Sequence, residues 1–450
     1  CKHRRHIIQY FSDPLTPLPH KAKPMNYPSL SAFISMLSAS MLFSGVCHAL
    51  TYPVEYHVGF SPATSEVSVR IDINDASKIS AIDFNLEESL CSGFASEDSL
   101  TRKQSRLVWR PKTGRATLNY RCKITHARKS SSGKISYDAM MTEDWALFRG
   151  DDIVPPVKVS AKKGWKSEAR LHFHLPENWH SVDTGLNRDL EHATEKGQKN
   201  TPVFFFDNPR RNFDRPTGWM IAGKIGTRRL KLGEAGKIQR VAVSAPENSD
   251  FRRMDILVFI HFIWPEFERA FQTLPEKILV VGGDDPMWRG GLSAGNSFYM
   301  HADRPIISEN GTSTLLHELV HMVTGVRGKP DHDWIAEGLA EYYSIELLHR
   351  AGGTNNDRYE NTVAQLQHWS KDVKSVRGNN SRGPMTAAAV LIFKQLDTEI
   401  RSATKAEKSL DDLTRILMTK NRVDLQDLKH AFKKVAGKTS NTLESPRLQE

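Results

Sequence analysis

A helix with two histidines on one face constrains this chain more than any other segment. Residues Thr312–Val323 repeat apolar side chains at helical spacing and contain the run His-Glu-Leu-Val-His at positions 317–321. Residues four apart share a helix face, so His317 and His321 can bind one ion together. Glu318 lies one position further round, within reach of water on that ion. The segment predicts a zinc site with Glu318 as the catalytic base.

A catalytic zinc needs a third protein ligand and one open position. The next predicted helix, Trp334–Arg350, carries Glu337 and Glu341 four residues apart on one face. One of them can bind the metal while the other holds a ligand histidine through its second ring nitrogen. The alternative is that both are solvated surface charges. Their position among apolar residues of the same helix favours a site for one Zn2+ per chain.

The pattern of the chain changes twice along its length. Residues 50–175 alternate apolar and polar side chains at period two, which predicts a β-sandwich-like domain. Residues 176–311 are mixed α/β, and residues 312–437 are helical. The sequence therefore predicts a multidomain α+β fold, and 450 residues are enough for two or three cores.

Individual elements follow from shorter runs. In the mixed part we expect strands at 203–206, 256–260 and 278–281, and a helix within 265–274. Beyond the two helices of the metal site we expect helices at 386–404, 410–419 and 425–436. Residues 438–450 are expected to form a loose tail.

Residues 1–49 have the features of a signal or targeting segment. The stretch 29–46 carries no charge, lysines at 21 and 23 precede it, and Val46-Cys47-His48-Ala49 has small residues where a signal peptidase reads them. The alternative is a membrane anchor, for which the stretch is short and rich in serine. The sequence predicts a periplasmic or secreted protein without stable membrane insertion after cleavage.

Two cysteines remain beyond that segment, Cys91 and Cys122. In an exported chain such a pair is expected to form a disulfide; the alternative is two buried free thiols.

The formal net charge of +10 does not indicate a nucleic-acid partner. The densest basic cluster, residues 228–231, is short, and no basic block alternates with aromatic residues. The expected partner is a peptide or protein substrate. A second histidine pair, His172 and His174, shares one face of a predicted strand and could bind metal, although such a pair is more often a solvated face.

The two predicted metal-site helices resemble those of the gluzincin metallopeptidases. The runs HELVH and WIAEGLAEYY are similar to the glycyl aminopeptidase family and its alanyl aminopeptidase relatives. The resemblance implies a thermolysin-like helical catalytic domain in which Glu337, from the W-x-x-E-G motif, is the third zinc ligand. Fifteen residues separate His321 from Glu337, fewer than in the alanyl aminopeptidases, and nineteen separate it from Glu341, as in thermolysin. Glu341 is then the residue that orients a ligand histidine. The specific motifs extend over roughly residues 290–437.

Two positions depart from the pattern of these families. Thr386 stands where they have a tyrosine that stabilises the oxyanion, and Ser293 stands where they have a glutamate that binds the substrate amino terminus. The second change favours an endopeptidase slightly over an aminopeptidase. The first leaves a degenerate peptide- or metal-binding protein as the alternative. The candidates for the missing oxyanion or substrate contact are Tyr359, His332, His368 and Arg382.

Overall fold

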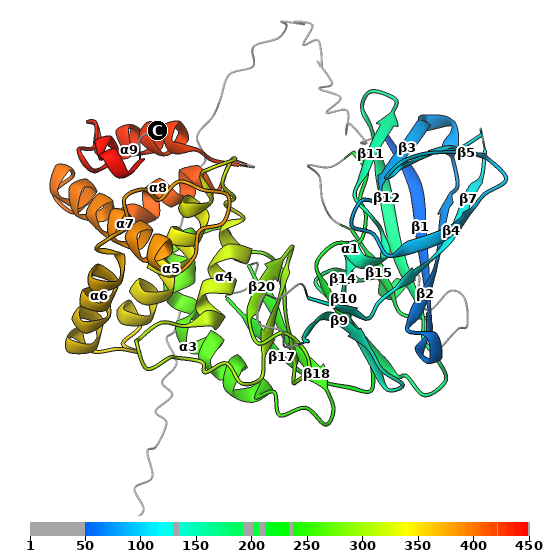
Figure 1. The fold of residues 1–450 in the computed structure, drawn as a ribbon, viewed down its shortest axis with the longest axis horizontal. Coiled ribbons are helices and arrows are strands. Elements are labelled where there is room, and N and C mark those ends of the chain that lie inside the picture. Colours follow the sequence, from blue (N-terminus) through cyan, green and yellow to red (C-terminus); the bar gives the residue numbers. More distant parts are fainter. Residues whose placement is uncertain are drawn as a thin grey trace, which may run out of the picture. The chain divides into compact units, whose positions relative to one another are not determined.

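The computed structural model describes residues 50–448 except 113, 129–134, 192–200, 207–211, 234–236 and 421. The fold is α+β, with several sheets and a helical C-terminal part (Figure 1). The predicted targeting segment, residues 1–49, lies outside the described residues. Among the described helices, none is both long and apolar enough to cross a bilayer.

The described residues of the N-terminal part form three sheets. A seven-stranded sheet has the order β14-β15-β12-β1-β2-β7-β4, in which β1 and β12 run parallel and the other described pairs are antiparallel. Its strands are β1 (Leu50–Ser61), β2 (Glu66–Ile73), β4 (Cys91–Ala95), β7 (Ala116–Lys123), β12 (Trp165–His174), β14 (Asn187–Arg188) and β15 (Val203–Phe205). Along β1, every second side chain from Tyr52 to Val58 is fully buried, as the period-two pattern predicts.

The two other N-terminal sheets are smaller. One has the order β11-β3-β6-β5 and consists of β3 (Ile79–Asn85), β5 (Ser99–Lys103), β6 (Arg106–Arg110) and β11 (Val157–Ala161). The second has the order β13-β16-β10-β9-β8 and consists of β8 (His126–Ala127), β9 (Tyr137–Met141), β10 (Trp145–Arg149), β13 (Ser181–Thr184) and β16 (Trp219–Gly223). The short helix α1 (Gly150–Ile153) follows β10. Strands beyond residue 175 thus pair with N-terminal strands, while the predicted domain limits stay predictions.

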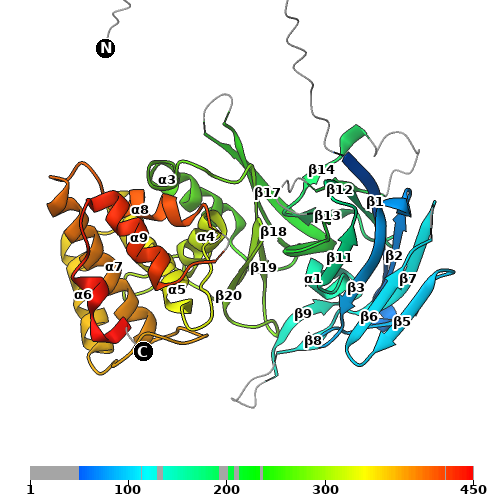
Figure 2. The same cartoon turned by 90° about the horizontal axis from the view of Figure 1, so that it is seen from above.

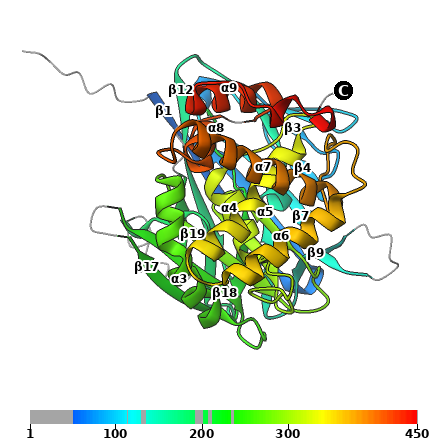
Figure 3. The ribbon, with the colours of Figure 1, turned by 90° about the vertical axis from the view of Figure 1, so that its left-hand side faces the viewer.

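The described residues of the part that contains the predicted metal ligands form a fourth sheet and seven α-helices (Figure 2). The sheet has the order β17-β18-β19-β21-β20, with strands β17 (Ile225–Leu232), β18 (Gln239–Pro246), β19 (Lys277–Gly283), β20 (Gly291–Ala294) and β21 (Ser297–His301). The helices are α3 (Arg253–Phe271), α4 (Thr314–Thr324), α5 (Asp333–Arg350), α6 (Asn356–Ser370), α7 (Pro384–Ala403), α8 (Leu410–Leu417) and α9 (Leu425–Ala436). Helix α5 packs against α3, α4, α6 and α7 (Figure 3).

One predicted strand is wrong. Residues 256–260 belong to helix α3, not to a strand. The apolar run resembled a buried strand, but buried residues recur at helical spacing through Ile260, Trp264 and Phe267, while Val258 is 61% exposed. The predicted helix within 265–274 is the second half of this same helix.

Two further segments differ from expectation. Helix α6 was not predicted, because it is mostly polar and buries only Thr362, Val363, Leu366 and Ser370. Residues 438–448 do not form a loose tail: Leu443 and Leu448 are buried in the core of the helical part.

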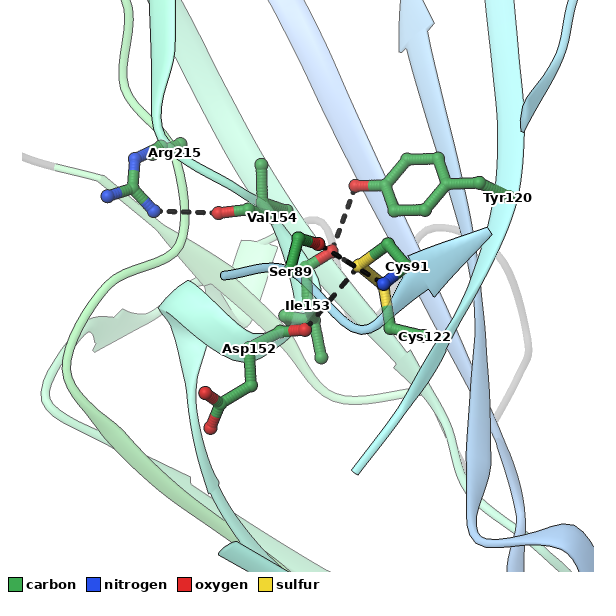
Figure 4. The surroundings of a disulfide bond; sticks show 8 residues. All are labelled: Ser89, Cys91, Tyr120, Cys122, Asp152, Ile153, Val154 and Arg215. Carbon is green, nitrogen blue, oxygen red and sulfur yellow. Dashed lines mark hydrogen bonds between the residues drawn. A yellow bond between two sulfur atoms is a disulfide. The ribbon is translucent and has the colours of Figure 1, made fainter. Parts of the chain in front are cut away.

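The two cysteines of the N-terminal part are joined by a disulfide (Figure 4). Cys91 on β4 lies directly opposite Cys122 on β7. The Cys122 sulfur lies 3.4 Å from the carbonyl oxygen of Ile153, which also accepts a hydrogen bond from Tyr120 at 2.9 Å. The disulfide therefore joins the edge strand of the seven-stranded sheet to its neighbour beside α1.

Candidate metal centre

Helix α4 presents both predicted histidine ligands to one point. Ser313 caps its start by accepting a hydrogen bond from the Leu316 N–H at 3.3 Å, and Gly325 ends it with φ near 60°. The Nε2 atoms of His317 and His321 lie 3.0 Å apart. Leu315, Leu316, Leu319 and Val320 are fully buried, so packing of the apolar face directs the two imidazoles outward from the core.

Glu337 on α5 completes the group. Its Oε2 lies 3.3 Å from Nε2 of His317, and its Oε1 lies 3.2 Å from Nε2 of His321. A zinc ion with bonds of about 2.0–2.1 Å places tetrahedral ligand atoms about 3.3 Å apart. The three side chains therefore fit a single Zn2+, and among the described residues they are the group of three that meets this condition.

Glu341 lies one turn beyond Glu337 on the same face of α5. Its Oε2 is 2.8 Å from Nδ1 of His317. Because a carboxylate only accepts, Nδ1 carries the proton and Nε2 presents its lone pair to the metal position. This contact is the one that the sequence assigned to an orienting residue.

The charges of the cluster favour a cation. Burial lowers the pKa of His317, but Glu337 and Glu341 more than offset it, so that this pKa lies well above its ordinary value. Burial raises the pKa of Glu337, but His317 and His321 lower it well below its usual range. The potential that holds a proton on the histidine also attracts a metal cation, which takes the place of that proton.

Glu318 lies beside the ligands and is only 7% exposed. Burial raises the pKa of its carboxyl, while His317 and His321 act in the opposite direction. The backbone N–H of Ser293 on β20 donates a hydrogen bond to it. A buried carboxylate with a raised pKa, next to a metal position, is suited to accept a proton from water and release it again.

Strand β20 runs close over α4 because Gly291 has no side chain. A Cβ atom there would lie 2.7 Å from Cγ2 of Thr314 and 2.9 Å from Cγ of Glu318. β20 is an edge strand, and among the described residues β21 is the strand that pairs with it. Beyond that pairing, its Ser293 N–H bonds Glu318 and its Leu292 carbonyl accepts a hydrogen bond from Trp219 at 2.7 Å. Ser293, the residue in place of the expected glutamate, lies in the middle of this strand.

Asp333 is a site residue that the sequence reasoning missed. It lies four residues before Glu337, so that Asp333, Glu337 and Glu341 form one acidic row on α5. Its Oδ2 accepts a hydrogen bond from the N–H of Ser381 at 2.8 Å. Burial raises its pKa, and Glu337 adds to this effect. The four-residue spacing of Glu337 and Glu341, continued toward the start of the helix, could have indicated Asp333.

Thr386, which the sequence analysis expects in place of a tyrosine, forms a hydroxyl pair with Ser381. Thr386, near the start of α7, has its Oγ1 3.3 Å from Oγ of Ser381. Ser381 is also the partner of Asp333, which links this loop to the acidic row. Arg382, a predicted contact, is exposed on the same loop.

The other predicted contacts are placed differently. His332 directly precedes α5, and its Nδ1 lies 2.7 Å from the carbonyl oxygen of Pro330. Tyr359 does not point to the metal centre: its hydroxyl donates to Glu346 at 2.9 Å and accepts from Lys394 at 3.0 Å. His368 is exposed on α6 and lines a hollow beside Asn310 and Arg358, with none of the metal ligands in its lining. Spacing along the chain gave no signal that could separate these residues.

Comparison with known proteins rests on the fold. No family model matches the sequence, and neither does any curated protein. Among solved structures, an aminopeptidase N family protein from Idiomarina loihiensis is 16% identical, over 87% of this chain and 72% of that chain, with a TM-score of 0.56. An M1 zinc metallopeptidase from Deinococcus radiodurans, solved with a Tyr-Ser-Ala substrate, is 13% identical, over 89% of this chain and 93% of that chain, with a TM-score of 0.56.

A third similar structure is aminopeptidase A from Legionella pneumophila in complex with aspartic acid, 13% identical over 89% of this chain and 50% of that chain, with a TM-score of 0.56. The fold is thus similar to that of zinc metallopeptidases, and the His-His-Glu cluster is compatible with a single zinc site. The similar structures include M1 zinc metallopeptidases and a protein of the aminopeptidase N family.

Proposed function

We propose that this protein is a zinc-dependent peptidase that hydrolyses peptide bonds with Glu318 as general base. The observation that carries the proposal is the convergence of His317, His321 and Glu337 next to that buried carboxylate. A structural metal site needs no such base, and four-coordinate structural sites leave no position for water.

Each side chain has a role in the reaction. His317, His321 and Glu337 would hold the zinc, and Glu341 would orient His317 through the 2.8 Å contact. A zinc ion supplies a Lewis acid and lowers the pKa of water bound to it. Glu318 accepts a proton from the attacking water and delivers it to the leaving nitrogen as the C–N bond breaks.

The substrate is proposed to lie along β20. An extended peptide can add to the open edge of this strand through backbone hydrogen bonds, which places its carbonyl groups beside Glu318. Ser293 offers no charge to a substrate amino terminus. The proposal therefore favours an endopeptidase slightly over an aminopeptidase, although the structural neighbours include aminopeptidases.

A second candidate is a degenerate member of the class that binds peptide or metal without turnover. Thr386 in place of the tyrosine favours it, because loss of one oxyanion donor costs about a hundredfold or more in rate. The intact base opposes it.

We also propose that the protein acts in the periplasm or outside the cell. The Cys91–Cys122 disulfide supports this, since such bonds persist in oxidising compartments.

Peptide-library cleavage by the purified protein, with free and with blocked amino termini, tests the activity. Glu318→Gln should reduce cleavage by about 100-fold or more while bound zinc, measured by elemental analysis, is unchanged. Glu309→Gln is the matched control, since Glu309 is an exposed residue outside the site.

Full cleavage by the Glu318→Gln variant would overturn the mechanism. Zinc binding without cleavage of any library peptide by the unaltered protein would favour the degenerate binding protein. Cleavage restricted to free amino termini would overturn the endopeptidase preference and leave the zinc peptidase standing.

A further inference from the structure

A basic hollow lies at the edge of the fourth sheet that is opposite to β20. Its volume is about 800 Å³, which is the size of a small-molecule site. Strands of three sheets line it: β13 from one, β14 and β15 from the second, and β17, β18 and the start of β19 from the fourth sheet. The three metal ligands are not among its lining residues. The basic hollow is therefore separate from the metal centre.

Part of the wall of the basic hollow is apolar. Val182, Phe204 and Val241 line it, and each of these residues is at most 7% exposed. Leu190 lines the same hollow and is 67% exposed, so apolar surface extends from the buried wall toward solvent. Covering such a surface with an apolar group is favourable, because it removes apolar area from water. The hollow can therefore hold the apolar body of a ligand.

The two carboxylates in the described lining are already paired with arginines. Nη2 of Arg229 donates to both carboxylate oxygens of Asp183, at 2.8 Å and 2.9 Å. Glu276 lies 3.9 Å from Nη2 of Arg240. Each carboxylate therefore offsets the charge of one arginine.

Three further cations line the basic hollow without a carboxylate of their own. Lys277 donates to the carbonyl oxygen of Leu186, which is a neutral acceptor. Arg188 and Lys231 are exposed, and neither forms an ion pair with another residue that the structure describes. With five cations and two carboxylates, the described lining has a net charge of +3.

This excess of positive charge acts on Lys277. Burial lowers the pKa of its ammonium group to about 8, Asp183 opposes this effect, and three arginines of the lining add to it. A bound anion would offset the repulsion among these cations. The attraction is stronger here than in open water, because the apolar wall lowers the local dielectric constant.

We propose that the basic hollow binds an anionic amphiphile, which is a carboxylate or phosphate head on an aliphatic or aromatic body. Arg188, Lys231 and Lys277 bind the head, and the body covers the wall at Val182 and Phe204. Guanidinium and ammonium groups bind both carboxylate and phosphate oxygens. A fatty acid and a single-chain lipid phosphate share this chemistry. The site does not depend on the peptidase activity proposed above.

The test is calorimetric titration of the purified full chain with octanoate and with octyl phosphate at low ionic strength. We expect binding of about one ligand per chain, and the head that binds more tightly identifies the source of the anion. Acetate has no apolar body and 1-octanol has no charge, so each should bind about tenfold more weakly or worse.

Charge-removing variants test the residues that bind the head. The Arg188→Gln/Lys231→Gln double variant should weaken octanoate binding about fivefold or more, because two exposed ion pairs are lost. The matched control is Arg102→Gln/Lys103→Gln, which makes the same change in net charge at two exposed residues of β5, outside the basic hollow. The control should bind octanoate as the unaltered protein does. Circular dichroism checks that both variants are folded.

Acetylation of Lys277 by acetic anhydride, followed by mass spectrometry, locates the bound ligand. At a ligand concentration ten times Kd, the reaction at Lys277 should slow about tenfold, since about a tenth of the protein is then free. The reaction at Lys371, an exposed residue of the helical part, should not change.

Four results would overturn the proposal. The first is that neither octanoate nor octyl phosphate binds, and the second is that acetate or 1-octanol binds as tightly as octanoate. The third is binding that leaves the acetylation of Lys277 unchanged. The fourth is an equal affinity for octanoate in the two double variants, because the cations of the hollow would then have no specific role.

Discussion

Glu341 accepts a hydrogen bond from Nδ1 of His317 at 2.8 Å, one helical turn away from the ligand Glu337. Glu341→Gln keeps the shape of the side chain but removes its charge, so the imidazole loses basicity and a defined orientation. We expect zinc affinity to fall about 10- to 100-fold, measured by competition with a chelator. Glu360→Gln, an exposed change on α6, is the control, and equal affinities in the two variants would contradict the orienting role.

Gly291→Ala should disturb the base and leave the metal ligands in place. The added methyl group would overlap Thr314 and Glu318, at 2.7 Å and 2.9 Å. We expect kcat to fall tenfold or more while the zinc content stays unchanged. The reason is that a displacement of Glu318 by about 1 Å removes the geometry that the reaction requires. Ser293→Ala keeps the backbone N–H that bonds Glu318 and should leave the rate close to that of the unaltered protein. A rate for Gly291→Ala as high as for Ser293→Ala would show that the close approach of β20 is unimportant.

The disulfide should contribute to stability without contributing to chemistry. Cys91 and Cys122 are 31 residues apart, and closing a loop of that length stabilises a fold by about 3 to 4 kcal/mol in the chain-entropy model. We expect the Cys91→Ser/Cys122→Ser double variant to melt at lower temperature while its kcat at 25 °C is retained. Equal melting temperatures for the oxidised protein and the double variant would refute this.

The lowered pKa of Lys277 predicts that the free energy of unfolding rises between pH 7.5 and 9.5. Burial, opposed by Asp183 and helped by nearby arginines, lowers its pKa to about 8, against 10.5 for an ordinary lysine. Below pH 8 both the folded and the unfolded state hold the proton. Above it only the unfolded state does, so the free energy of unfolding grows with pH, by at most on the order of 3 kcal/mol.

The check is chemical denaturation at several pH values, with Lys277→Met as the comparison. The variant lacks this titration, so its stability should change less over the same interval. The window ends below the titration of the buried tyrosines, whose pKa values are raised by burial. If the free energy of unfolding changes equally with pH in the two proteins, the pKa of Lys277 is not lowered in the folded state.

The metal centre was largely predictable because the spacing of residues within each helix determines which side chains share a face. The spacing of His317 and His321 places them on one helix face, and the four-residue spacing of Glu337 and Glu341 does the same on the next helix. The packing of α4 against α5 brings the two faces together. Spacing within each helix does not predict this packing, and only the resemblance to known peptidases implied it.

The predictions that failed concern an ambiguous apolar run and residues whose positions depend on tertiary structure. The strand predicted at 256–260 failed because five apolar residues in a row fit a buried strand and a buried helix equally well. Tyr359 and His368 were candidates by residue type alone, and their positions depend on α6, a helix with too few buried residues to be recognised. The position of His57 beside His172 depends on the parallel register of β1 and β12, strands more than a hundred residues apart.

Helix α5 carries Asp333, Glu337 and Glu341 on one side and is fixed from the other. The Tyr343 hydroxyl bonds to Asp411 at 3.1 Å and to Thr414 at 3.0 Å, both on α8. A residue change on α8 can therefore rotate the acidic row and alter zinc affinity without touching a ligand. Zinc affinity in this protein should therefore depend on how firmly α8 holds α5, although α8 itself carries none of the metal ligands.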